Sequence, residues 1–333
     1  VAIALMGANV LIARTLGPDG QGLYAAAIAL TTVGVQLGNF GLHTSNTFFV
    51  FLNRNNLGAL LCNSLVVALF AGVIVSLVFF FFFEYFLQKL GVNSSIVQFI
   101  LIWVPMGLAL VYFQGLLVGL QNIKAYNLVE ILQRLGQLLL LVLITILGLA
   151  SVQSMYFGSL LALGLSALMA FIFLYRINNN KIGVFSFPLL RTTFKYGIHV
   201  YLAALFSFLV LKIDLLMVKA MCGATPAGFY SVAVTLGDAL FILPTTVGVI
   251  LLSKLSAENN WLVRRQLLLK VLGILTVLML GLVGVAAFAA APMVHLLFGD
   301  IYLPSVDSFI WLLPGIFLLS LSTSMQNYLA ALR

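Results

Sequence analysis

The residues in this sequence most able to do chemistry are charged side chains inside hydrophobic segments. Lys212 and Asp214 lie two positions apart in one such segment, and Asp238 lies in the next. Glu130 and Arg134 are spaced i, i+4, which places them on one face of a helix in the order that favours an ion pair. Because a charge in hydrocarbon costs about 2.5–3.5 kcal/mol on insertion scales, such residues mark a partner, a cavity or an ion path.

Each of these charges has a functional and a structural interpretation. In the functional interpretation Lys212 binds an anion, and in the structural one its long stem reaches the membrane surface. Asp214, whose stem is too short for that, is interpreted as a site for a cation or proton. Arg134 lines a polar cavity with Glu130 holding it in place, or the two form a neutralised pair in the interior. Asp238 is an ion or gating site near a proline kink, or it bonds to a neighbouring segment.

Uncharged polar side chains form a second group, in the hydrophobic segment 23–51. Gln36, Asn39 and His43 are spaced so that they fall on one stripe of a helix. Amides and an imidazole donate and accept hydrogen bonds without charge, which suits a neutral ligand rich in hydroxyl groups. The alternative of equal weight is hydrogen bonding between membrane helices, worth about 0.6 kcal/mol per contact.

The composition places all these residues in a membrane protein. Of 333 residues, 63% are hydrophobic and 7% are charged, whereas about a quarter are charged in a soluble domain. Apolar segments of about 20 residues recur along the chain, and each can cross about 30 Å of hydrocarbon as a helix. We therefore predict an all-α polytopic membrane protein. Its ten predicted spans are 1–15, 23–51, 58–86, 95–120, 125–149, 152–175, 194–219, 227–252, 264–290 and 305–332.

A turn between two spans occurs twice in the chain. The matching residues are Gly17, Gly22, Tyr24, Ala27 and Leu30 in the first copy and Gly223, Gly228, Tyr230, Ala233 and Leu236 in the second. An even number of spans separates the copies, so both point the same way through the membrane, as in parallel repeats. We predict two helical lobes around a central cavity: an N-terminal lobe (1–176), a cytoplasmic linker (177–193) and a C-terminal lobe (194–333). Both ends of the chain are expected to be truncated.

The distribution of charge sets the orientation and excludes several functions. With the N-terminus in the cytoplasm, most basic loop residues fall on the cytoplasmic side, as the positive-inside rule requires. The net charge of +8 is scattered over short loops, so no nucleic-acid partner is expected. The sequence contains no P-loop, HExxH or GxSxG motif and no cluster of metal ligands. We expect no enzymatic activity, catalytic residue, metal or cofactor, and leave coupling to H⁺ or Na⁺ open.

Several motifs carry a family resemblance. Arg14-Thr-Leu-Gly-Pro-Asp-Gly-Gln-Gly-Leu-Tyr24 resembles the A-R-x-L-G-P-x-x-x-G-x-Y pattern of Wzx-type polysaccharide flippases. These belong to the multidrug/oligosaccharidyl-lipid/polysaccharide exporter (MOP) superfamily. The stretch 38–42 resembles their D-x-G-L element, with asparagine where aspartate is frequent. Lys212-Ile-Asp214, followed by Gly228 and Tyr230, is similar to their (K/R)-x-D … G-x-Y.

The resemblance implies twelve to fourteen helices in two six-helix lobes that open alternately. It implies a flippase that turns polyprenyl-pyrophosphate-linked oligosaccharide from the inner to the outer leaflet of the bacterial cytoplasmic (inner) membrane, for surface polysaccharide synthesis. The expected partners are that substrate, membrane lipids, and glycan polymerases and glycosyltransferases.

On this hypothesis the polar residues divide into three roles. Lys212 and Arg134 neutralise pyrophosphate, while Gln36, Asn39 and His43 accommodate sugar hydroxyls; Asp214, Asp238 and Glu130 serve ion coupling or gating. An ion-coupled multidrug or cation antiporter of the same superfamily is the first alternative, and it would favour carboxylates over cations in the cavity. A glycan polymerase or ligase is the second, and it would need a sizeable outer loop that the sequence lacks.

Overall fold

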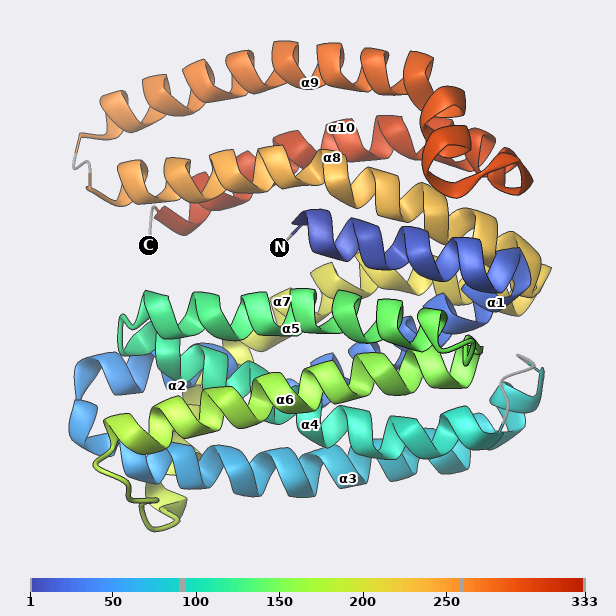
Figure 1. Ribbon diagram of the computed structural model, residues 1–333. Coiled ribbons are helices and arrows are strands. Elements are labelled where there is room, and N and C mark those ends of the chain that lie inside the picture. Colours follow the sequence, from blue (N-terminus) through green and yellow to red (C-terminus); the bar gives the residue numbers. More distant parts are fainter. Residues whose placement is uncertain (1, 90–93, 258–259, 332–333) are drawn as a thin grey trace. The chain divides into compact units, whose positions relative to one another are not determined.

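The computed structural model describes residues 2–89, 94–257 and 260–331, and every regular element in them is helical. Figure 1 shows the helices coloured along the chain. They are α1 (Ala2–Asn39), α2 (Leu42–Leu52), η1 (Arg54–Asn56), α3 (Leu57–Lys89), α4 (Ser94–Gly119), α5 (Ile123–Ile146), α6 (Val152–Ile177), α7 (Phe187–Cys222), α8 (Ala224–Ala257), α9 (Trp261–Phe298), η2 (Asp300–Tyr302) and α10 (Ser305–Ala331).

These helices make the chain a multi-pass membrane protein. In the described part, eight helices are long and apolar enough to cross a bilayer, or nine if the bent pair of α1 and α2 counts as one span. Large apolar side chains point outward from them, for example Val277 and Phe288 of α9, which are 73% and 92% exposed. The predicted count of ten spans is not confirmed. Within α1, two helices join across a kink at Gly17, which lies in the first predicted turn.

Helix α7 begins earlier than the sequence indicated. It starts at Phe187, inside the predicted linker 177–193. The Ser186 side chain accepts a hydrogen bond from the Leu189 N–H, and Pro188 occupies the first turn. Serine as N-cap with proline just inside a helix is a start signal, so the predicted linker 177–193 extends too far towards the C-terminus. The division into lobes at this linker stays a prediction.

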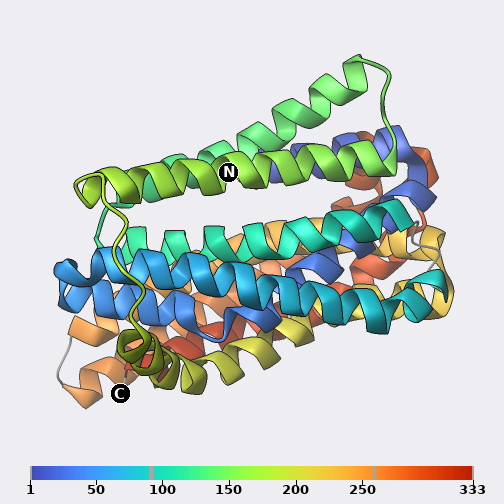
Figure 2. The same cartoon turned by 90° about the horizontal axis from the view of Figure 1, so that it is seen from below.

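The chain forms two compact units, Val1–Gly228 and Phe229–Arg333. In the first, α4 is the central helix and packs against α1, α2, α3, α5 and α6. Its residues Val104, Leu108, Tyr112 and Leu116 are fully buried at a spacing of four, so one face of α4 forms the core. Figure 2 shows α5 and α6 as a neighbouring pair of the same unit.

In the second unit, α9 and α10 pack side by side. Between them Tyr302 of η2 is buried, with its ring against Phe298 and Phe229. This burial raises the pKa of the Tyr302 phenol, which therefore stays neutral. Helix α8 approaches α10 closely, because a Cβ at Gly237 would lie 2.8 Å from Ile316 Cδ1.

Candidate functional site

The first polar region of the N-terminal unit is a break between α1 and α2. Phe40 (φ 47°) and Gly41 (φ 75°) have left-handed backbone, and the two helices are bent by 49°. Positive φ is uncommon for a bulky residue, and here the Phe40 ring packs against Phe194 and Tyr201 of α7. The predicted segment 23–51 is therefore not one continuous helix.

Two tyrosines satisfy the carbonyl groups that the break releases. The Tyr112 hydroxyl of α4 donates to the carbonyl of Gly38 at 3.0 Å and to that of Asn39 at 3.3 Å. The Tyr201 hydroxyl of α7 donates to the carbonyl of Leu37 at 2.9 Å. Non-helical backbone at membrane depth persists only where protein or a polar cavity provides such partners. The break is thus built into the packing of α1, α2, α4 and α7.

The predicted stripe of Gln36, Asn39 and His43 is divided by this break. All three side chains are half-buried, but Gln36 and Asn39 end α1, whereas His43 lies in the first turn of α2. The Asn39 Oδ1 accepts a hydrogen bond from the His43 N–H at 3.3 Å, so Asn39 satisfies one N–H in the first turn of α2, whose N-cap residue is Gly41. The sequence spacing identified three neighbouring polar groups but not their place on either side of a bend.

The second polar region lies on α5. Glu130 and Arg134 form an ion pair, with Arg134 Nε 3.1 Å from Glu130 Oε1. The other carboxylate oxygen accepts a hydrogen bond from Gln114 Nε2 of α4, also at 3.1 Å. The side chains of Arg134 and Glu130 are 31% and 22% exposed, so both are partly accessible. The pairing is confirmed, and it fits both the structural and the cavity-lining interpretation of Arg134.

One turn further along α5, a neutral network joins three helices. The Tyr24 hydroxyl of α1 and the Ser159 hydroxyl of α6 are 2.8 Å apart. Gln137 Nε2 of α5 donates to Ser159 Oγ at 3.1 Å and to Tyr24 Oη at 3.3 Å. Sequence reasoning missed Gln114, Gln137 and Ser159. The available signal for Gln137 was its place three positions after Arg134, on the same helix face.

The remaining predicted charges lie on α7 and α8. Lys212 and Asp214 are half-buried on α7, and Asp214 Oδ1 accepts a hydrogen bond from the Leu215 N–H at 2.7 Å. Helix α1 packs against both α7 and α5, the helix that carries Arg134. Asp238 is exposed on α8 in the other compact unit. The cation-binding and anion-binding roles of these side chains stay predictions.

The duplicated turn forms a symmetric contact within the N-terminal unit. A Cβ on Gly22 would lie 1.9 Å from the carbonyl oxygen of Ala224, and a Cβ on Gly228 would lie 1.9 Å from that of Pro18. Each glycine meets the residue that follows the positive-φ glycine of the other copy. The Thr225 hydroxyl donates to Asp19 Oδ1 at 3.3 Å, between positions 206 apart. The two copies therefore pack against each other at one end of the helices.

Comparison with known proteins decides the family. A family described as "Polysaccharide biosynthesis protein" matches residues 1–251. The chain belongs to this family. The polysaccharide biosynthesis family was the expected one, since the motifs resemble its Wzx-type members. No curated protein matches the sequence of this chain significantly.

Comparison with solved structures shows that the chain has the fold of a MOP superfamily transporter. A multidrug resistance MATE family transporter in its inward-facing conformation has a TM-score of 0.72 and 14% identity over 99% of this chain and 83% of its own. A MOP superfamily transporter from Pyrococcus furiosus, described as having a binding pocket of reverse polarity that suggests a different function, has a TM-score of 0.63 at 14% identity over 99% and 83%. An outward-facing MATE transporter has a TM-score of 0.60 at 15% identity over 100% and 82%.

Proposed function

We propose that the protein is a flippase for polyprenyl-pyrophosphate-linked oligosaccharide, acting from the inner to the outer leaflet of the bacterial cytoplasmic membrane. The observation that carries the proposal is the match of residues 1–251 to a polysaccharide biosynthesis family in a chain with a transporter fold. Moving a charged, sugar-bearing headgroup through hydrocarbon requires polar protein groups that replace water. The half-buried cations Arg134 and Lys212 supply positive charge for the pyrophosphate, and Gln36, Asn39 and His43 supply hydrogen bonds for sugar hydroxyls.

The test is lipid flipping by the purified protein in vesicles. Vesicles contain a fluorescent polyprenyl-pyrophosphate oligosaccharide, and a membrane-impermeant glycosidase cleaves only the molecules in the outer leaflet. We expect the protein to increase the fraction that the glycosidase cleaves, relative to vesicles with an unrelated membrane protein. An unchanged fraction would refute the proposal.

A second candidate function is an ion-coupled multidrug or cation antiporter, favoured by the similarity to MATE structures. In that case Asp214, Asp238 and Glu130 would bind the exchanged cation or the coupling H⁺ or Na⁺. Accumulation of an amphipathic fluorescent cation, driven by a pH or Na⁺ gradient in the same vesicles, would support the antiporter. The flippase proposal expects no such accumulation.

A further inference from the structure

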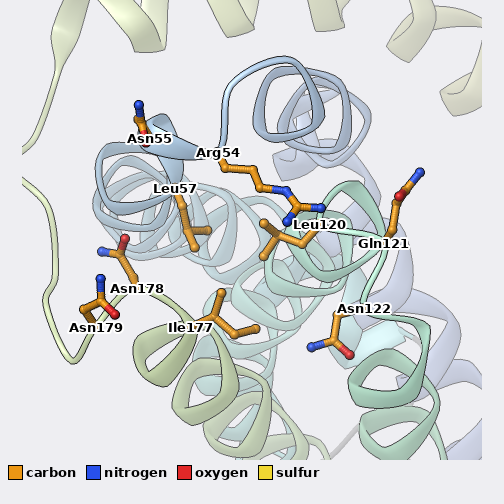
Figure 3. Close-up of a pocket in the computed structure, with 9 residues that line it drawn as sticks. All are labelled: Arg54, Asn55, Leu57, Leu120, Gln121, Asn122, Ile177, Asn178 and Asn179. Carbon is orange, nitrogen blue, oxygen red and sulfur yellow. The ribbon is translucent and has the colours of Figure 1, made fainter.

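A cavity of about 650 Å³ opens at one end of the helices in the N-terminal unit. It lies among η1, the start of α3, the turn between α4 and α5, and the end of α6, and Figure 3 shows its lining side chains. Its lining residues are Arg54, Asn55, Leu57, Leu120, Gln121, Asn122, Ile177, Asn178 and Asn179. A cavity of this size falls within the range of small-molecule sites, about 300–1,000 Å³.

The lining has one cation, several amides and an apolar floor. The floor consists of Leu57 and Leu120, which are 3% and 9% exposed and belong to the hydrophobic core of the unit. In Figure 3 the Arg54 side chain extends over this floor towards Leu120, while Ile177 and Asn122 lie on the opposite side. A guanidinium binds phosphate oxygens through two parallel hydrogen bonds.

Two of the amides are already oriented by the backbone. Asn122 Oδ1 accepts a hydrogen bond from the Ala125 N–H at 3.1 Å as the N-cap of α5, so its NH₂ group is the part left for a ligand. Asn178 Nδ2 donates to the carbonyl of Lys181 at 2.7 Å, so its oxygen is left to accept from a hydroxyl group. The cavity therefore offers donors for an anion and an acceptor for a hydroxyl.

The charge around the cavity favours an anion as well. The connecting segments at this end, 53–57, 120–124 and 176–186, contain Arg54, Lys124, Arg176 and Lys181 and no aspartate or glutamate. The N-terminus of α5 adds its partial positive charge. A site with positive potential and no opposing carboxylate concentrates anions from solution or from a leaflet.

We propose that this cavity binds a phosphate group joined to a polyol, with Arg54 and the Asn122 amide on the phosphate and Asn178 on a hydroxyl. The ligand is either a soluble sugar or glycerol phosphate or the headgroup of an anionic lipid in the adjacent leaflet. The site is separate from the residues assigned to the flipped substrate, and it does not depend on the proposed flippase activity.

The experiment is a binding titration with the full-length protein in a neutral detergent. Two probes are used: glycerol 3-phosphate for the soluble source and short-chain phosphatidylglycerol for the lipid source, with short-chain phosphatidylcholine as the zwitterionic comparison. Arg54→Gln should weaken binding about tenfold or more, since it removes a charge-assisted hydrogen bond to the phosphate. Arg54→Lys, which keeps the charge but not the planar fork, should fall between Arg54→Gln and the unmodified protein.

Lys181→Gln is the matched control, because it removes one positive charge at the same end from a residue that does not line the cavity. It should change the affinity by less than about twofold, as expected for an exposed charge. Binding of either probe that Arg54→Gln weakens and Lys181→Gln does not supports the site. Binding of the lipid alone or of glycerol 3-phosphate alone also identifies the source. An equal loss in Arg54→Gln and Lys181→Gln, or no binding of either probe, would overturn the proposal.

Discussion

At the scale of single residues, the Tyr112 hydroxyl holds the break between α1 and α2. We expect Tyr112→Phe to leave the Gly38 and Asn39 carbonyls short of a donor and to lower the free energy of unfolding by about 1–3 kcal/mol. Thermal unfolding in detergent measures the effect. Tyr175→Phe on α6 is the control, since its hydroxyl forms no hydrogen bond within the described part of the chain. Equal Tm values for the two variants would show that the hydroxyl does not support the break.

A second prediction at this scale separates structural from substrate-binding roles of Arg134. Arg134→Gln leaves the Glu130 carboxylate with only the Gln114 amide, and we expect a loss of about 1–3 kcal/mol in stability. Adding Glu130→Gln removes the uncompensated charge and should restore Tm. If Arg134 binds pyrophosphate, the double variant stays defective in flipping although it is stable again. Recovery of flipping together with stability would assign Arg134 a structural role only.

Other residue-scale features differ in how far the sequence could predict them. The i, i+4 spacing of Glu130 and Arg134 was enough to predict their ion pair, because both partners lie on one helix. The hydrogen bond from Gln114 to Glu130 and the one from Gln137 to Ser159 each join two different helices, so no local spacing indicates that these partners meet. The conformation of Phe40 depends on ring contacts with α7, which outweigh the steric cost of positive φ. Such tertiary contacts are not visible in local sequence.

At the scale of elements, the contact between the two copies of the turn should not tolerate a methyl group on Gly22. Gly22→Ala places a Cβ 1.9 Å from a backbone oxygen that has little room to move, so the turns must separate or the helices shift. We expect a disulfide between Asp19→Cys and Thr225→Cys, made with both native cysteines replaced by serine, to form readily in the parent and poorly after Gly22→Ala.

Gly7→Ala, in the part of α1 before the kink at Gly17, is the control for this contact between the turns. Its Cβ would meet only Leu138, at 3.7 Å, and alanine should stabilise a helix interior by about 0.5–1 kcal/mol. Unaltered disulfide formation in Gly22→Ala would mean that the turns do not approach so closely. The repeat itself could be predicted from sequence, because identical residues recur at one offset; the reciprocal packing of its copies required the structure.

At the scale of the whole molecule, the contact between the two turns has a consequence for topology. Segments that touch outside the hydrocarbon lie on the same side of the membrane, so this contact supports the prediction that an even number of spans separates Gly22 from Gly228. Parallel repeats require this arrangement. The basic residues around the cavity at Arg54 lie in different connections of the chain, and the positive-inside rule predicts that these connections face the cytoplasm.

Labelling with a membrane-impermeant maleimide tests this topology on intact cells. Cys222 is exposed at the end of α7, next to the second turn, and we expect it to be modified from outside, with Cys222→Ser as the unlabelled control. In that serine background, Asp19→Cys should also react from outside, whereas Lys181→Cys should react only after the membrane is opened. Reaction of Asp19→Cys and Cys222 from opposite sides would contradict the parallel repeats. Reaction of Lys181→Cys alone in intact cells would invert the orientation while leaving the repeat intact.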